Sequence, residues 1–153
     1  MTQAGPNPYL RTKILTAGPE ELRLMLYEGA IRFCHQARTA LEARDWEGSY
    51  SNLMRAQKIV LELSTSLNHK VAPELCARLS ALYTYIYRRL VDANVQHTTA
   101  AIDEALKLLA YERETWQLLM AKLGSSPAGQ PGPGRGNVTG AQQTAISSLS
   151  MTG

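Results

Sequence analysis

Residues 18–41 read GPEELRLMLYEGAIRFCHQARTAL, and this stretch decides the fold class. Its opening, Gly18 to Glu21, is typical of a helix N-terminus, because proline fits the first turn and acids face the positive end of the helix dipole. The apolar residues that follow recur three and four positions apart, as they do on one helical face: Leu22, Met25, Leu26, Ala30, Phe33, Ala37 and Leu41. The stretch predicts a long amphipathic helix.

A second apolar line runs beside the first in the same helix. Its members are Leu24, Tyr27, Ile31 and Cys34. The two lines together are wider than the single stripe that a helix needs when it packs on one core. This helix therefore carries more apolar surface than one packing contact uses.

Three more helical segments follow. Asp45 is expected to cap the second helix, Pro73 and Glu74 to open the third, and Thr98 or Thr99 to cap the fourth. Helices of about 22 to 25 residues, joined by loops of about two to five residues, place each helix antiparallel to the next. The sequence thus predicts an all-α fold, an antiparallel up-down four-helix bundle. The residues expected to face inward from these three helices are Tyr50, Leu53, Ala56, Val60, Leu63 and Leu67; Leu75, Leu79, Leu82, Ile86 and Leu90; and Ile102, Ala105, Leu106, Leu109, Trp116, Met120 and Leu123.

Composition divides the chain into three regions. The bundle is expected at residues 19–123, after a leader of residues 1–18 that has no helical or strand period of its own. Residues 124–153 include ten Gly or Pro and eight Ser or Thr residues, and a single charge. Such a segment buries too little apolar surface to offset its chain entropy, so we expect a disordered tail.

Several classes of protein are disfavoured. The longest apolar run without a charge, Leu79 to Tyr87, has nine residues, against about 20 for a membrane span. The N-terminus lacks the regions of a signal peptide. Cys34 and Cys76 fall in helical patterns, where buried thiols are expected rather than disulfides. A net charge of +3 with interleaved signs does not indicate nucleic-acid binding. We expect a cytoplasmic protein without direct membrane insertion.

Motifs for catalysis or metal binding are missing from the sequence. The residues three positions before the histidines are Arg32, Ser66 and Asn94, so no Glu-x-x-His pair for a di-metal site is present. Adjacent residues such as Cys34 and His35 point about 100° apart on a helix and cannot form a nucleophile–base pair. No phosphate-binding loop or nucleophile elbow occurs. We expect no catalytic residue, metal or cofactor.

Excess apolar surface is the informative feature. Tyr83, Tyr85 and Tyr87 cannot all face inward from one helix, so some lie at the core boundary or in an interface. The leader holds four large apolar residues: Tyr9, Leu10, Ile14 and Leu15. One arrangement explains both this leader and the two-sided first helix. The leader packs over a groove beside that helix and can be displaced by another apolar segment.

Several separated motifs resemble one family. Residues 14–22 (ILTAGPEEL) and 24–33 (LMLYEGAIRF) are similar to the opening of the flagellar secretion chaperones, the FliS family. Further matches follow in order at residues 56–59 (AQKI), at residues 82–90 (LYTYIYRRL) and at Trp116. The resemblance covers about residues 9–123. Gly18 stands where the family usually has serine, and Glu28 where it has aspartate.

The resemblance implies a chaperone, not an enzyme, that binds the disordered C-terminal segment of flagellin. In this family the chaperone prevents premature polymerisation and delivers flagellin to an export-gate component, while its N-terminal segment gives way to the client. We expect the lid at the four apolar leader residues, and a monomer or weak homodimer. The groove is expected at Leu24, Tyr27, Ile31 and Cys34, with Tyr83, Tyr87 and Leu90. The alternative is a helical-bundle adaptor for another amphipathic helix; an enzyme ranks third.

Overall fold

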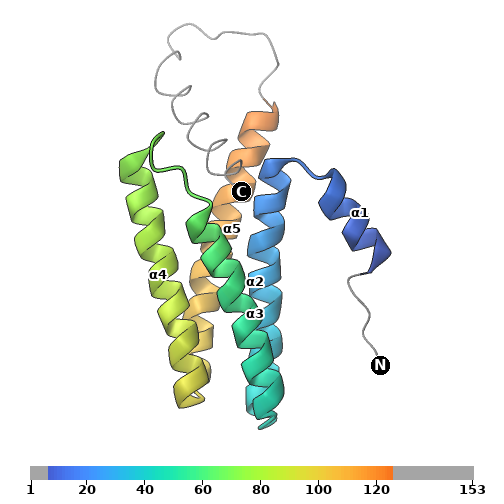
Figure 1. Cartoon of the computed structure of the whole chain (residues 1–153), viewed down its shortest axis with the longest axis vertical. Helices are drawn as coiled ribbons and strands as arrows, with labels where there is room; N and C mark the ends of the chain where they lie inside the picture. Colours follow the sequence, from blue (N-terminus) through green and yellow to red (C-terminus); the bar gives the residue numbers. More distant parts are fainter. Residues whose placement is uncertain (1–6, 126–153) are drawn as a thin grey trace, which may run out of the picture.

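The computed structural model describes residues 7–125. This part consists of five helices and their connections (Figure 1): α1 (Pro8–Thr16), α2 (Pro19–Glu42), α3 (Trp46–Thr65), α4 (Pro73–Gln96) and α5 (Thr99–Ser125). None of these helices is long and apolar enough to cross a membrane. The expected disordered tail lies outside the described residues, apart from the last two residues of α5.

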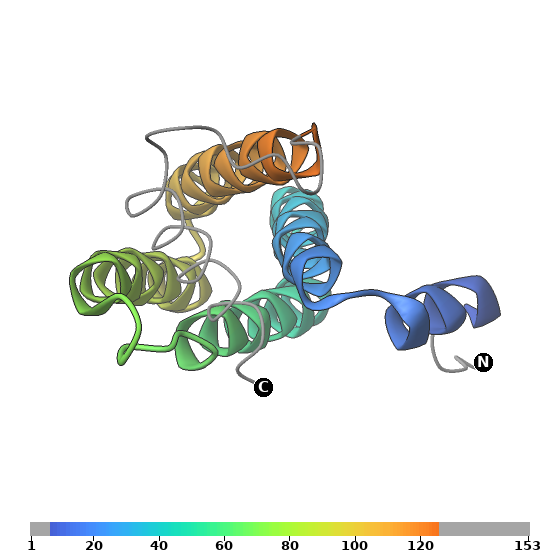
Figure 2. The same ribbon diagram turned by 90° about the horizontal axis from the view of Figure 1, so that it is seen from above.

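Helices α2 to α5 form a closed four-helix bundle. Helix α2 packs against α3 and α5, and α4 packs against the same two neighbours. Figure 2, which looks along the bundle, shows these helices as the sides of a four-sided arrangement with α1 outside, next to α2. Short connections make consecutive helices run in opposite directions. The predicted all-α bundle is confirmed.

The helix ends follow the capping residues of the sequence. The Asp45 carboxylate accepts a hydrogen bond from the Gly48 backbone N–H at 2.9 Å, and Pro73 is the first residue of α4. Before α5, the Thr98 hydroxyl accepts a bond from the Ala100 N–H at 3.2 Å. Of the two threonines considered, Thr98 is therefore the one whose side chain caps the helix.

The connection between α3 and α4 is longer than expected. It covers residues 66–72, against the two to five predicted. Asn68 organises it: its side-chain oxygen accepts a bond from the Lys70 N–H at 3.1 Å, and its carbonyl accepts one from Cys76 Sγ at 3.3 Å. An asparagine that bonds the backbone two residues ahead forms a local turn. A longer connection can thus be ordered without becoming helical.

The leader contains a helix that its apolar pattern did not predict. Asn7 caps α1 by accepting a bond from the Tyr9 N–H at 2.7 Å, and Pro8 occupies the first helical position. No residue of α1 is buried. Local capping therefore defines this helix, whereas tertiary packing defines α2 to α5.

The core is apolar and lies between the four bundle helices. Its largest fully buried side chains include Tyr83, Leu53, Leu63, Ile86, Leu90, Ile102 and Leu109. Two residues that were expected to face inward, Tyr50 and Leu75, are exposed instead. Both lie in the first turns of their helices, near the ends of the bundle, where the amphipathic period continues but no neighbour covers it.

One polar group lies deep in this core. Arg23 of α2 is only 3% exposed. Its guanidinium donates hydrogen bonds to Ser66 Oγ at 3.1 Å and to the Tyr83 hydroxyl at 2.8 Å. The Tyr83 hydroxyl also lies 2.5 Å from that of Tyr27. We call Arg23, Ser66, Tyr27 and Tyr83 the arginine network.

Aromatic rings surround the same cation. The guanidinium carbon of Arg23 lies 5.7 Å from the ring centre of Trp116, and within 6 Å of the rings of Tyr27 and Tyr83. Trp116 in turn donates its indole N–H to the Glu20 carbonyl at 2.9 Å. The arginine network and Trp116 therefore join α2 to α4, to α5 and to the end of α3.

Burial changes the acidity of the two phenols. It raises the pKa of Tyr83 far above its usual value, and that of Tyr27 in the same direction, although the nearby Arg23 cation opposes both shifts. The unfolded chain loses these protons near pH 10, whereas the folded chain keeps them. The free energy of unfolding should consequently fall as the pH rises above about 10.

Ultraviolet titration of phenolate tests this property. The folded protein should keep two phenols protonated until alkaline unfolding releases both together, while Tyr85, whose bond to Glu104 raises its pKa, ionises later than a free phenol. Tyr83→Phe should reduce the number of protected phenols by one. Folded protein that ionises all seven tyrosines in parallel with the unfolded chain would contradict the burial of the network.

Candidate functional site

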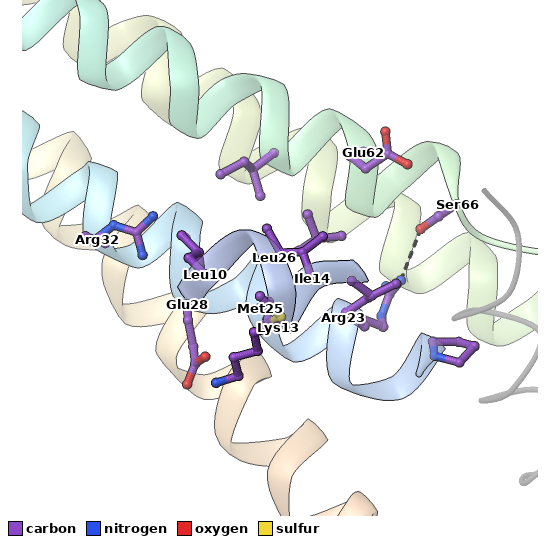
Figure 3. Close-up of a pocket in the computed structure, with 14 residues that line it drawn as sticks. Leu10, Lys13, Ile14, Arg23, Met25, Leu26, Glu28, Arg32, Glu62 and Ser66 are labelled. Atoms are coloured by element: carbon purple, nitrogen blue, oxygen red, sulfur yellow. Dashed lines mark hydrogen bonds between the residues drawn. The ribbon is translucent and has the colours of Figure 1, made fainter. Parts of the chain in front are cut away.

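A cavity of about 420 Å³ is lined by residues of α1, α2 and α3. Figure 3 shows Leu10 and Ile14 projecting from α1 near Leu26 of α2. We call this cavity the lid groove. Its large apolar lining residues are Leu10 and Ile14 of α1, Leu22, Met25 and Leu26 of α2, and Ile59 of α3.

The α2 wall of the lid groove follows from helical geometry. Leu22, Met25, Leu26 and Gly29 are three or four residues apart and share one face. Their large side chains are half-buried. Helix α2 is therefore apolar on two faces, one toward the core and one toward the groove.

The sequence prediction assigned several residues of these two faces to the wrong side. Tyr27, Ile31 and Cys34 were expected to line a groove, but they are buried in the core. Of the residues expected to face inward, Leu22, Met25 and Leu26 line the groove instead, whereas Ala30, Ala37 and Leu41 are buried in the core as expected. The spacing reveals two stripes but not which stripe faces the neighbouring helices. Arg23 and Tyr27, one turn apart, share the buried face.

The remaining α2 and α4 residues of the predicted groove are distributed differently. Tyr83 and Leu90 are fully buried in the core, so their expected exposure is also wrong. Leu24 and Tyr87 are partly buried against the core. Tyr87 borders a second, smaller cavity of about 140 Å³ between α3 and α4. A partner-binding role for Leu24 and Tyr87 stays a prediction.

Tyr83, Tyr85 and Tyr87 of α4 differ in exposure, as their spacing predicted. Tyr83 faces the core, Tyr87 is half-buried, and Tyr85 is exposed. The Tyr85 hydroxyl donates to Glu104 of α5 at 2.6 Å, and the same carboxylate accepts a bond from Arg89 at 2.6 Å. These exposed contacts fasten α4 to α5 rather than forming part of the lid groove.

Half of the predicted lid residues reach the groove. Leu10 and Ile14 are one turn apart on α1 and both line it. Tyr9 and Leu15 are each 75% exposed and belong to other faces of the helix. A groove beneath the leader is present as expected, but two of the four apolar leader residues do not cover it.

Charged groups border the apolar lining. Lys13, Glu28, Arg32 and Glu62 line the groove, as does Arg23 of the arginine network. Figure 3 shows Arg23 bonded to Ser66 across from the α1 residues. An apolar lining with charges of both signs around it suits an amphipathic peptide segment.

No His or Cys side chain is among the described residues that line the lid groove. Within residues 7–125, no group of three or more His, Cys, Asp or Glu side chains could hold a metal ion. The Cys34 thiol is buried, which raises its pKa to about 12 and keeps it protonated. What the groove offers is an apolar binding surface.

Comparisons with known proteins agree with this description. A family model described as "Flagellar protein FliS" matches residues 1–123. The chain is 40% identical over 114 residues to the flagellar secretion chaperone FliS of Bacillus subtilis (strain 168), an alignment covering 72% of this chain and 84% of the relative.

Two further relatives carry the same name. The flagellar secretion chaperone FliS of Salmonella typhimurium is 32% identical over 114 residues, covering 74% of this chain and 84% of the relative. That of Campylobacter jejuni is 31% identical over 111 residues, covering 72% and 87%. With a closed bundle, a covered apolar groove and a family match that extends from the leader through α2 to α5, the chain belongs to the FliS family of flagellar proteins.

Proposed function

We propose that this protein is a cytoplasmic chaperone for flagellin. It binds the disordered C-terminal segment of flagellin, prevents that segment from polymerising early, and aids its delivery to the export gate. Membership of the FliS family supports the proposal, as do the names of the relatives. The single structural observation that carries it is the lid groove, an apolar cavity covered by a helix that is itself largely exposed.

The groove suits a client that folds as it binds. Ordering a disordered segment costs about 2–5 kcal/mol. Each large apolar side chain that moves from water into an apolar site contributes about 1.5–3 kcal/mol. Three client side chains against Met25, Leu26 and Ile59 would offset that cost. The charges beside the groove can then select the register of the bound helix.

Helix α1 acts as a displaceable lid in this proposal. Its large apolar residues in the groove are Leu10 and Ile14, with Lys13 beside them, and no residue of α1 is buried. A client with several large apolar residues in sequence makes more such contacts than this nine-residue helix. The lid therefore shields the groove in the free protein and gives way when flagellin arrives.

Met25→Glu tests the groove directly. Met25 lines the groove and is half-buried, so a carboxylate there should leave the bundle folded but meet the apolar face of the client. We expect at least a tenfold loss of affinity, or about 1.4 kcal/mol. The measurement is calorimetric titration with a flagellin fragment of about 50 residues, long enough to follow helices of this length.

Leu118→Glu is the matched control, because Leu118 is an exposed apolar residue of α5. It should bind the fragment as the unmodified protein does. If Met25→Glu bound the fragment as tightly as the unmodified protein does, the lid groove would not be the binding site. Undiminished binding of flagellin that lacks its C-terminal segment would favour an adaptor for a different helix.

The lid is tested by serine substitutions in α1. The double variant Leu10→Ser/Ile14→Ser should free the groove and raise client affinity about five- to tenfold, because more molecules are then competent to bind. Tyr9→Ser/Leu15→Ser makes equivalent changes on exposed faces and should have little effect. A lower affinity of the first variant, measured by the same titration, would show that these residues hold the client rather than exclude it.

A further inference from the structure

Gly29 lies in the interior of α2 and forms part of the lid groove. It is buried, and its neighbours along the groove face are Met25 and Leu26, about one turn earlier. A glycine inside a helix is less favourable than alanine, because it loses more backbone freedom on folding. Something other than helix stability therefore accounts for glycine at this position.

Packing between α2 and α3 does not fully explain it. A Cβ atom on Gly29 would lie 3.2 Å from Ile59 Cδ1 and 4.0 Å from Arg32 Nη2. Both atoms are the ends of flexible side chains. Apart from the backbone of α2 itself, nothing else would lie within 4 Å. Alanine would thus need a shift of a few tenths of an ångström by one side chain, at a position that also lines the groove.

The other glycines of the helices provide two points of comparison. A Cβ on Gly48 would lie impossibly close to the Asp45 carboxylate that caps α3, so local structure requires glycine there. A Cβ on Gly124, near the end of α5, would meet nothing within 4 Å. Gly29 differs from both, because a Cβ there would make one tight contact, with Ile59 Cδ1 at 3.2 Å, and the residue lines a cavity.

We propose that Gly29 is a specificity-determining residue, and that its missing side chain makes room for one large apolar side chain of the client. The inference rests on the proposed function and refines it. The client residue would be aliphatic or aromatic, seated over the Gly29 backbone between Met25, Leu26 and Ile59. A methyl group at position 29 would occupy the deepest part of that seat.

Gly29→Ala tests this inference, with Gly124→Ala as the control for helix propensity. Both variants should unfold at the temperature of the unmodified protein or higher. Gly29→Ala should lower affinity for the flagellin fragment on the order of tenfold, whereas Gly124→Ala should bind normally. Unchanged binding by Gly29→Ala, or a lower unfolding temperature, would overturn the inference.

A second variant separates filling of the groove from strain between α2 and α3. Ile59→Val removes the Cδ1 atom that a methyl at position 29 would approach. Because Ile59 itself lines the groove, Gly29→Ala/Ile59→Val is compared with Ile59→Val alone. When the groove is filled, the methyl at position 29 should lower affinity by the same factor with Ile or Val at position 59. Recovery of affinity in the double variant would assign the effect to displaced Ile59 and overturn the inference.

A different binding result is expected if the proposed function itself is wrong. If the flagellin fragment binds neither the unmodified protein nor Gly124→Ala, flagellin is not the client. The proposed seat for a flagellin side chain is then rejected as well. Normal binding by Gly29→Ala, beside weak binding by Met25→Glu, would keep the function and reject only the role of Gly29.

Discussion

Burial of the Arg23 cation is the constraint on which the rest of the structure depends. A guanidinium carries its charge at every ordinary pH and must be solvated by protein groups when water is excluded. Ser66, Tyr83, Tyr27 and Trp116 provide that environment, and all except Tyr27 lie outside α2. Arg23 and Tyr27 are one turn apart, so burying this pair fixes which face of α2 enters the core.

That choice of face exposes the other apolar stripe of α2. Once Tyr27, Ala30 and Cys34 are in the core, the face with Met25 and Leu26 has no bundle helix to cover it completely. A short capped helix from the leader shields part of it. The resulting cavity is apolar, bordered by charges and lined on one side by α1, which suits the binding of an amphipathic segment. Burial of Arg23 and Tyr27 thus determines both how the core packs and which face of α2 is left to line the groove.

The sequence predicted the bundle far better than the groove. The hydrophobic period and the capping residues Asp45, Pro73 and Thr98 were sufficient to predict four antiparallel helices. They did not reveal the face of α2 that packs inward, because two apolar stripes with the same period are equivalent until neighbours are placed. Arg23 was overlooked because arginine is usually exposed, although it falls in phase with Tyr27 and Cys34. Gly29, a glycine in mid-helix, was an available signal for the groove.

The most direct test is to identify which methyl groups of the chaperone touch the client. Nuclear Overhauser effects can be measured between a flagellin C-terminal fragment and the methyl groups of the full chain. The account predicts contacts to Met25, Leu26 and Ile59, together with shifts of the Ile14 signals as α1 moves away. Contacts confined to the outer face of α5, such as Leu118, with the Met25 and Ile59 signals unchanged, would contradict it.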